Sequence, residues 1–146
     1  MSWRAVRILL AEDNEGDIFL VRRALEKRGL SFQLAVAHNG EEALRLLDAA
    51  EAGPTADVPT LILLDLNLPR VDGGEILARL RKTPVFSKTP VIVITSSDSP
   101  RDRNLAMSLG ASAYFRKPTD LSSFMQLGQV VEAALAQGKA EEKRWH

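Results

Sequence analysis

The sequence contains no cysteine, and this absence removes several chemistries at once. Disulfide bonds, zinc sites with thiolate ligands and cysteine nucleophiles are all excluded, and the composition fits a reducing compartment. Long hydrophobic runs are also missing, since the first apolar stretch, residues 6–11, is interrupted by Arg7 and followed by Glu12 and Asp13. A membrane-spanning helix needs about 20 apolar residues. We therefore expect a cytoplasmic protein without a signal peptide or a membrane span.

The chain also lacks an excess of charge of either sign. The 19 basic side chains balance 19 acidic ones, so no overall charge draws the chain to DNA phosphates or to an anionic membrane. We expect no nucleic-acid partner and no membrane partner. With 146 residues, 45% of them hydrophobic, the chain can form one domain with a full core but not two comfortable ones. We predict a domain over residues 5–137 and a short charged tail over residues 138–146.

Short apolar runs alternate along the chain with stretches that carry helix signals. We predict strands at residues 6–10, 33–37, 60–64, 91–95 and 113–115. Three of these runs are almost continuously apolar, which is typical of parallel strands covered by helices on both faces. Asn14, Asn39 and Ser99 are suited to cap the helices that follow them. The last helix is predicted from about Asp120 to Gln137. This order predicts a doubly wound α/β domain with a five-stranded parallel sheet and five helices.

Polar side chains follow the predicted strands at their carboxyl ends, where the ligand site of an open parallel sheet lies. Glu12 and Asp13 follow the first strand and Asp65 the third. Three carboxylates at one place repel one another unless a cation lies among them, and oxygen ligands favour Mg²⁺. Lys117, after the fifth strand, adds a positive charge, and Thr95, at the end of the fourth, adds a hydroxyl that can donate to a phosphoryl oxygen. The set predicts Mg²⁺-assisted phosphoryl transfer.

An ordered series of motifs connects these positions. It comprises Glu12-Asp13, the segment Leu63-Leu64-Asp65-Leu66-Asn67-Leu68-Pro69, the turn Asp72-Gly73, Thr95, and Lys117-Pro118. Each motif alone is common, but together and in this order they are specific. The sequence therefore resembles the receiver domain of two-component response regulators, with matches from residue 7 to residue 135. Residues 11–17 and the insertion before the third strand are further similar to single-domain regulators that partner phytochrome-type histidine kinases.

The resemblance implies a flavodoxin-like fold with strand order 2-1-3-4-5 and a metal site. Asp65 is implied to accept a phosphoryl group from a sensor histidine kinase. Asp13 and Asp65 would bind Mg²⁺ directly, Asn67 through its main-chain carbonyl, and Glu12 through water. Receivers often carry aspartate at the position of Glu12, and the longer side chain still permits a water-mediated contact. Such a protein signals through a conformational change and catalyses only its own phosphorylation and dephosphorylation, so it is not an enzyme in the usual sense.

The resemblance also implies how the phosphoryl group is held and sensed. Thr95 and Lys117 would each bind one phosphoryl oxygen, and the backbone of Ser96 would serve the third. Thr95 and Tyr114 would form the conformational switch, with Tyr114 three residues before the lysine. Pro118 would follow a cis peptide bond, although even a bond before proline favours trans by about 0.5–1 kcal/mol.

A homodimer through the fourth helix, the fifth strand and the fifth helix is the predicted means of output. The last helix carries more apolar residues than the roughly 100° stripe that faces a core requires. These residues are Leu121, Phe124, Met125, Leu127, Val130, Val131, Ala134 and Leu135. The resemblance to phytochrome-partner regulators suggests the same dimer. The alternative is that this small domain simply has a generous last helix.

Other functions and plainer roles remain open at this point. Haloacid-dehalogenase-type phosphatases also use an aspartate nucleophile and Mg²⁺, but they need a second acid two residues later, where this chain has Asn67. A phosphorylation-independent binding module of the same fold usually lacks part of the acidic set or the lysine. A flavin-binding protein needs a phosphate loop that does not follow the first strand here. Individually, Asp13 could cap a helix, Lys117 could be a solvated lysine and Tyr114 a plain sheet residue.

Overall fold

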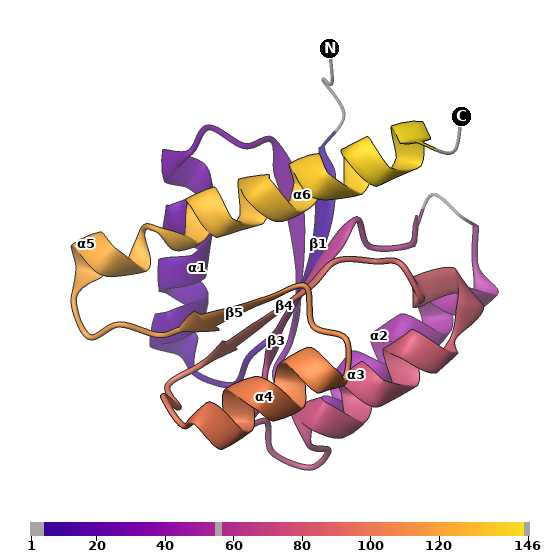
Figure 1. The fold of residues 1–146 in the computed structure, drawn as a ribbon, viewed down its shortest axis with the longest axis horizontal. Helices are drawn as coiled ribbons and strands as arrows, with labels where there is room; N and C mark the ends of the chain where they lie inside the picture. Colours follow the sequence, from indigo (N-terminus) through magenta and orange to yellow (C-terminus); the bar gives the residue numbers. More distant parts are fainter. Residues whose placement is uncertain (1–4, 55–56, 145–146) are drawn as a thin grey trace.

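A computed structural model describes residues 5–54 and 57–144 of the chain. The elements in chain order are β1 (Val6–Ala11), α1 (Glu15–Lys27), β2 (Phe32–Ala37), α2 (Gly40–Ala52), β3 (Leu61–Asp65), α3 (Gly73–Lys82), the 3₁₀ helix η2 (Pro84–Phe86), β4 (Val91–Thr95), α4 (Pro100–Ser108), β5 (Ala113–Arg116), α5 (Leu121–Phe124) and α6 (Leu127–Arg144). The strands pair in parallel in the order β2-β1-β3-β4-β5 (Figure 1). The predicted fold class and strand order are confirmed.

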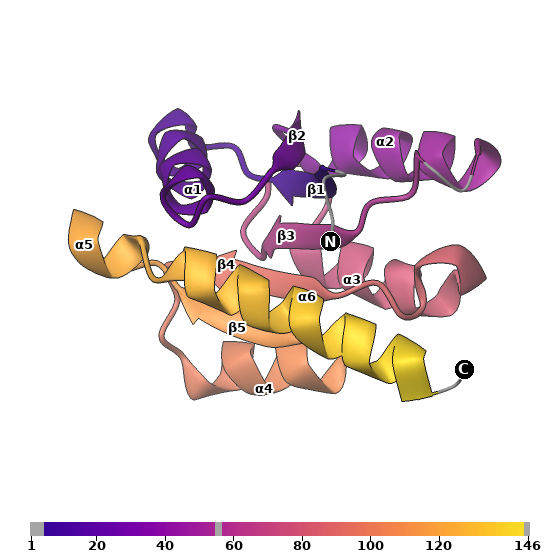
Figure 2. The same cartoon turned by 90° about the horizontal axis from the view of Figure 1, so that it is seen from above.

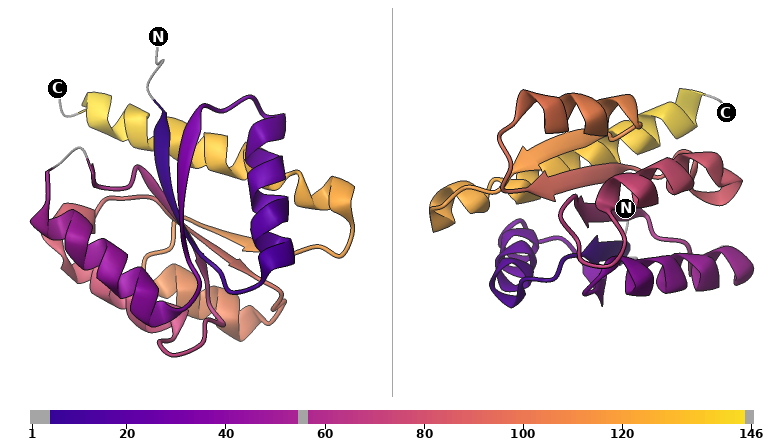
Figure 3. Two further views of the ribbon diagram at one scale, coloured as in Figure 1. Left: turned by 180° about the vertical axis from the view of Figure 1, so that it is seen from behind. Right: turned by 90° about the horizontal axis from the view of Figure 1, so that it is seen from below.

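Helices cover both faces of this sheet. In Figure 2 the strands lie between α1 on one side and α2 and α3 on the other. Helices α5 and α6 share the face of α1, whereas α4 lies on the face of α2 and α3. Figure 3 shows α2 and α3 side by side on their face of the sheet. Because each face needs an apolar cover, the central strands are buried on both sides.

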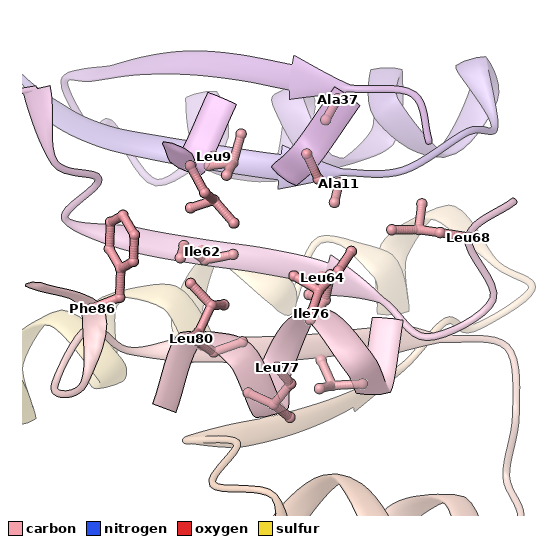
Figure 4. Packing of buried hydrophobic residues seen from close by; sticks show 14 of the residues in the cluster. Leu9, Ala11, Ala37, Ile62, Leu64, Leu68, Ile76, Leu77, Leu80 and Phe86 are labelled. Carbon is pink, nitrogen blue, oxygen red and sulfur yellow. The ribbon is translucent and has the colours of Figure 1, made fainter. Parts of the chain in front are cut away.

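The side chains of β3 show why its sequence is continuously apolar. Leu61 and Leu63 pack into the core under α1 and α6, and Ile62 and Leu64 pack into the core under α2 and α3 (Figure 4). All four side chains are at most 1% exposed. Burying one leucine side chain contributes about 1.5–3 kcal/mol, so the strand that ends at Asp65 is firmly held.

The predicted helix starts are confirmed by their caps. The side chain of Asn14 accepts a hydrogen bond from the N–H of Asp17 at 2.9 Å, and that of Asn39 accepts one from the N–H of Glu42 at 2.9 Å. Ser99 caps α4 in the same way. Such caps satisfy backbone donors that a helix leaves unpaired in its first turn.

The predicted last helix is wrong in two respects. It is divided at Met125 and Gln126 into α5 and α6, and it continues past Gln137 to Arg144, so the predicted tail is helical that far. Residues 145–146 lie outside the described residues. A glycine such as Gly138 weakens a helix by about 1 kcal/mol but does not stop one when good helix formers follow.

Helix α6 lies close to α1 because Gly128 has no side chain. A Cβ atom at this position would lie 2.3 Å from Arg28 Cγ and 2.8 Å from the carbonyl oxygen of Ala24. The chain therefore turns at the end of α5 and starts α6 against α1. Within the part of the chain that the structure describes, no helix combines the length and apolar character needed to cross a membrane.

Candidate functional site

The carboxyl ends of β1, β3 and β5, together with the first turn of α1, bring one lysine and three carboxylates together. Lys117 Nζ donates hydrogen bonds to Glu12 Oε1 at 2.5 Å, to Asp17 Oδ2 at 2.8 Å and to Asp65 Oδ2 at 3.0 Å. The side chain of Lys117 is 10% exposed, and that of Asp65 is 7% exposed. The predicted convergence of Glu12, Asp65 and Lys117 is confirmed, whereas Asp17 was not predicted to belong to the site.

Local backbone contacts fix these positions. The N–H of Glu12 donates to the carbonyl of Ala37 at 2.9 Å, which continues the β1–β2 pairing into the site. The N–H of Lys117 donates to the carbonyl of Thr95 at 2.7 Å and ties the end of β5 to that of β4. A Cβ atom on Gly73 would lie 2.4 Å from the carbonyl oxygen of Asp65, so only glycine lets α3 start this close to the acceptor strand.

Glu12 is the most deeply buried charged side chain of the site. It is fully buried, and its Oε2 atom has no hydrogen-bond partner among the described residues. The pKa of Glu12 is raised to about 9, mainly by burial and additionally by the neighbouring Asp65, and the hydrogen bond from Lys117 offsets only part of this. Without a cation, Glu12 therefore carries a proton at neutral pH.

Asp65 and Lys117 stay ionised in the same surroundings. Burial alone would raise the pKa of Asp65, but hydrogen bonds with Glu12 and the N–H of Asn67, together with the charge of Lys117, lower it below the ordinary value. Burial would lower the pKa of Lys117, but its hydrogen bonds to Asp17 and Glu12 raise it above the ordinary value. Asp65 is thus an anion held beside a cation, which suits a nucleophile.

The donor set fits a hard divalent cation. Glu12, Asp13 and Asp65 each offer a carboxylate oxygen, and these oxygens lie within 4.8 Å of one another. The unpartnered Oε2 atom of buried Glu12 is an open ligand position. Oxygen ligands of this kind are what Mg²⁺ prefers. Asn67 lies next to this group, because its N–H donates to Asp65 Oδ1 at 2.9 Å; its predicted role through the main-chain carbonyl stays a prediction.

Thr95 and Tyr114 are connected through the loop after β4. Thr95 is fully buried, and its Oγ1 accepts hydrogen bonds from Asn67 Nδ2 at 3.3 Å and from the N–H of Ser97 at 3.2 Å. The hydroxyl of Tyr114 donates to the carbonyl of Ser97 at 3.0 Å, and the guanidinium of Arg103 lies 5.3 Å from the centre of its ring. The main chain of Ser97 thus joins the two predicted switch residues.

Two further predicted residues have different outcomes. Ser96 is exposed beside Thr95, and its predicted contact to a phosphoryl oxygen stays a prediction. The predicted cis bond before Pro118 is wrong, because no cis peptide bond occurs in the described residues. The trans isomer is the intrinsically favoured one, and with it Lys117 still reaches Asp65.

Because Glu12 is buried and holds a proton, the free energy of unfolding should depend on pH. Glu12→Gln should remove this dependence. The pKa of Glu12 is raised from 4.5 in the unfolded chain to about 9 in the fold. The contribution of Glu12 to the stability of the fold is therefore fully present below pH 4.5 and is lost as the pH rises toward 9. In EDTA, the variant should be as stable as the wild type near pH 4.5 and at least about 1–3 kcal/mol more stable near pH 9, since an ionised buried carboxylate costs more than a neutral unsatisfied group.

Urea unfolding of both proteins across this pH range measures the difference. The exposed Glu26, on the outer face of α1, provides a control, because Glu26→Gln should run parallel to the wild type at every pH. A wild-type advantage at pH 9 in EDTA would contradict the assignment of the proton to Glu12.

Comparisons with known proteins agree with this arrangement. A family model for the response regulator receiver domain matches residues 8–128 of the chain. The probable methanogenesis regulatory protein FilR2 of Methanothrix harundinacea is 37% identical over 125 residues, which cover 86% of this chain and 78% of that protein. Response regulator Rcp1 of Synechocystis is 32% identical over 126 residues, which cover 86% of each chain.

Two solved structures share the fold over most of their length. The phosphorylated cyanobacterial phytochrome response regulator RcpA superposes with a TM-score of 0.78 and 33% identity, and 88% of this chain and 92% of that chain are covered. The Mn²⁺-bound form of Rcp1 superposes with a TM-score of 0.77 and 33% identity over the same shares. One of these relatives is thus phosphorylated and the other holds a divalent cation.

Proposed function

Because this chain belongs to the response regulator receiver domain family, we propose that it accepts a phosphoryl group from a sensor histidine kinase on Asp65 and signals through the resulting conformational change. The observation that carries this proposal is the contact of Lys117 Nζ with Asp65 Oδ2 at 3.0 Å inside a group of carboxylates. A buried anion next to a fixed cation can attack phosphorus and then share the new charge with the lysine.

Each residue around Asp65 has its own role in the proposed phosphoryl transfer. An oxygen of Asp65 forms the new bond to phosphorus while the bond from phosphorus to the histidine nitrogen of the kinase breaks. Lys117 and Thr95 would each bind one oxygen of the transferred group, and the Ser96 backbone the third. Mg²⁺ bound by Asp13 and Asp65, with Glu12 and Asn67 contributing as predicted, would neutralise charge on the phosphoryl oxygens.

The rival phosphatase reaction has no acid in the required place. The side chain two residues after Asp65 is Asn67, and its amide nitrogen donates to Thr95 Oγ1. An amide cannot serve as general acid and base, so hydrolysis of an external substrate is not favoured. The binding-module alternative is also disfavoured, because Glu12, Asp13 and Lys117 are all present.

The names of the relatives support a narrower partner. Rcp1 and RcpA are response regulators, and RcpA is described as a phytochrome response regulator. We therefore propose a phytochrome-type histidine kinase as the phosphoryl donor of this chain. Since such a kinase takes its phosphoryl group from ATP, we place the protein in the cytoplasm.

The proposed function is tested by incubating the protein with Mg²⁺ and acetyl phosphate. Intact mass spectrometry should show one added phosphoryl group that base removes, because an aspartyl phosphate is an acyl phosphate. The same incubation in EDTA should leave the mass unchanged. A wild-type protein that stays unmodified with Mg²⁺, acetyl phosphate and a phosphorylated kinase would refute the proposal.

The proposed output is a homodimer through α4, β5 and the predicted fifth helix, which in the structure is divided into α5 and α6. The apolar excess predicted on the last helix is mostly inside, since Phe124 is 1% exposed and packs edge-on against Phe115. Leu121 of α5 remains 61% exposed, and α4 adds two further exposed apolar side chains, since Leu105 is 51% exposed and Met107 46% exposed. Such side chains are candidates for burial between two copies of the chain.

A charged side chain on α4 should therefore weaken self-association. The test uses protein treated with Mg²⁺ and beryllofluoride, a mimic of a phosphoryl group on aspartate. We expect Leu105→Glu to lower the dimer fraction of this protein by at least about tenfold, because a buried unpaired charge costs several kcal/mol. Sedimentation velocity with and without beryllofluoride measures it. Phe19→Glu, at an equally exposed apolar position on α1, should leave the dimer fraction unchanged. A monomer in every state, or equal effects of both variants, would contradict this interface.

A further inference from the structure

Asp17 is a carboxylate that the roles described above leave without a function. It lies in the first turn of α1, where its N–H donates to Asn14 Oδ1 at 2.9 Å. Its Oδ2 accepts a hydrogen bond from Lys117 Nζ at 2.8 Å, although the two residues are 100 positions apart. A carboxylate at a helix N-terminus is favoured by the helix dipole, and the Asn14 cap fixes the backbone that carries it.

Lys117 uses all of its donors on three carboxylates. An ammonium group has three N–H donors, and here they go to Glu12, Asp17 and Asp65. Glu12 and Asp65 also belong to the group whose oxygens can hold a metal ion, and Asp17 does not. A cation at that group competes with the lysine for oxygens of Glu12 and Asp65. Asp17 is the partner that this competition leaves to the lysine.

We propose that Asp17 is a positioning residue that holds the ammonium group of Lys117 beside Asp65 when a divalent cation is bound. This inference rests on the proposed function, because it assigns to Lys117 the task of pairing with a phosphoryl group on Asp65. A lysine side chain has many rotamers, and ordering it costs conformational entropy. The hydrogen bond to Asp17 orders the Lys117 side chain before the phosphoryl group arrives, so less conformational entropy is lost when that group binds. This is preorganisation.

The negative charge of Asp17 also has an opposite effect. A carboxylate near the site repels an incoming anion, and this repulsion alone would make removal of Asp17 favourable. The charge of Asp17 is paired directly with the ammonium group of Lys117 at 2.8 Å, so this cation cancels much of its repulsion at the site. The hydrogen bond to Lys117 is direct and far less exposed, since Lys117 is 10% exposed. Positioning therefore outweighs repulsion, and this decides the sign of the expected effect.

Beryllofluoride, which mimics a phosphoryl group on aspartate, tests the inference in the full-length chain. Titrations at saturating Mg²⁺, followed by the ¹⁹F NMR signal of the bound mimic, should show about 3- to 10-fold weaker binding for Asp17→Ala. Asp17→Asn keeps an oxygen acceptor for the lysine, so its loss should be smaller. Because Asp17 lies outside the metal group, the Mg²⁺ affinity of both variants should stay within about twofold of the wild type.

Two comparisons separate positioning of Lys117 from a general effect on the fold. In a Lys117→Ala background, Asp17→Ala should weaken beryllofluoride binding by less than about twofold, because a residue that acts through the lysine has nothing left to position. Glu15→Ala removes the same charge from the same helical turn, at a side chain that is 79% exposed and pairs with His38. That control should bind beryllofluoride like the wild type.

Each outcome has one meaning. Equal or tighter beryllofluoride binding by Asp17→Ala, or an undiminished loss in the Lys117→Ala background, would overturn the positioning role while leaving the proposed function in place. A wild-type protein that binds no beryllofluoride and takes no phosphoryl group would instead overturn the proposed function. If Asp17→Ala unfolds, Asp17→Asn decides alone, and wild-type beryllofluoride affinity in that variant would refute the proposal.

Discussion

Asp65→Asn is expected to abolish phosphoryl labelling and to leave the fold intact. The variant has no carboxylate to attack phosphorus, so incubation with Mg²⁺ and acetyl phosphate should add no mass to the protein. The amide oxygen of asparagine can still accept the hydrogen bond that Asn67 N–H gives to Asp65 Oδ1 at 2.9 Å. Lys117 keeps two carboxylate partners, Glu12 and Asp17. Far-UV circular dichroism should therefore match the wild type.

A second aspartate makes this result specific to Asp65. Asp48 lies on α2, where it pairs with Arg79 on the surface and is remote from the metal group. Asp48→Asn should take up one phosphoryl group at the wild-type rate. Undiminished labelling of Asp65→Asn would place the acceptor at another residue, and Asp13 would be the next to examine.

Asp13→Asn is expected to weaken Mg²⁺ binding by at least about tenfold. Changes to groups that only orient a metal ligand typically cost about 10- to 100-fold in affinity, and loss of a charged ligand should cost at least as much. Asp13 is the exposed member of the group with Glu12 and Asp65, so its replacement leaves the buried carboxylates and their contacts to Lys117 in place. Isothermal titration calorimetry with Mg²⁺ measures the change.

The matched control for Asp13 is Asp98. It lies in the exposed loop after β4 and pairs with Arg116 at 3.6 Å, outside the metal group. Asp98→Asn should bind Mg²⁺ as the wild type does. Equal affinities of the wild type and Asp13→Asn would mean that the cation binds away from this acidic group.

The sequence predicted the main residues of the site because they follow strands. Side chains directly after parallel strands must meet at one edge of the sheet, so the positions of Glu12, Asp65 and Lys117 follow from the apolar runs alone. Asp17 lies inside a helix, and its approach to Lys117 depends on how α1 is rotated and packed against α5 and α6. No periodicity in the sequence specifies that rotation.

Other differences between prediction and structure concern features with small energies. The break between α5 and α6 lies just before Gly128, which packs closely against Arg28, a contact between segments far apart in the sequence. The isomer before Pro118 is decided by about 0.5–1 kcal/mol, which surrounding structure can override in either direction. The link from Thr95 to Tyr114 runs through the main chain of Ser97, and a main-chain contact leaves no signature in residue types.

The unpartnered oxygen of Glu12 makes protons and cations competitors. In the cation-free fold Glu12 keeps its proton up to a pH of about 9, since that is its raised pKa. Ionisation of Glu12 for metal binding at neutral pH must release this proton to the solvent. The apparent affinity of the proposed Mg²⁺ site should therefore rise with pH below that value, and the heat measured on binding should include the ionisation heat of the buffer that takes up the proton. If the site binds Mg²⁺ as proposed, one buried carboxylate would link the proposed phosphorylation of the chain to Mg²⁺ and to pH.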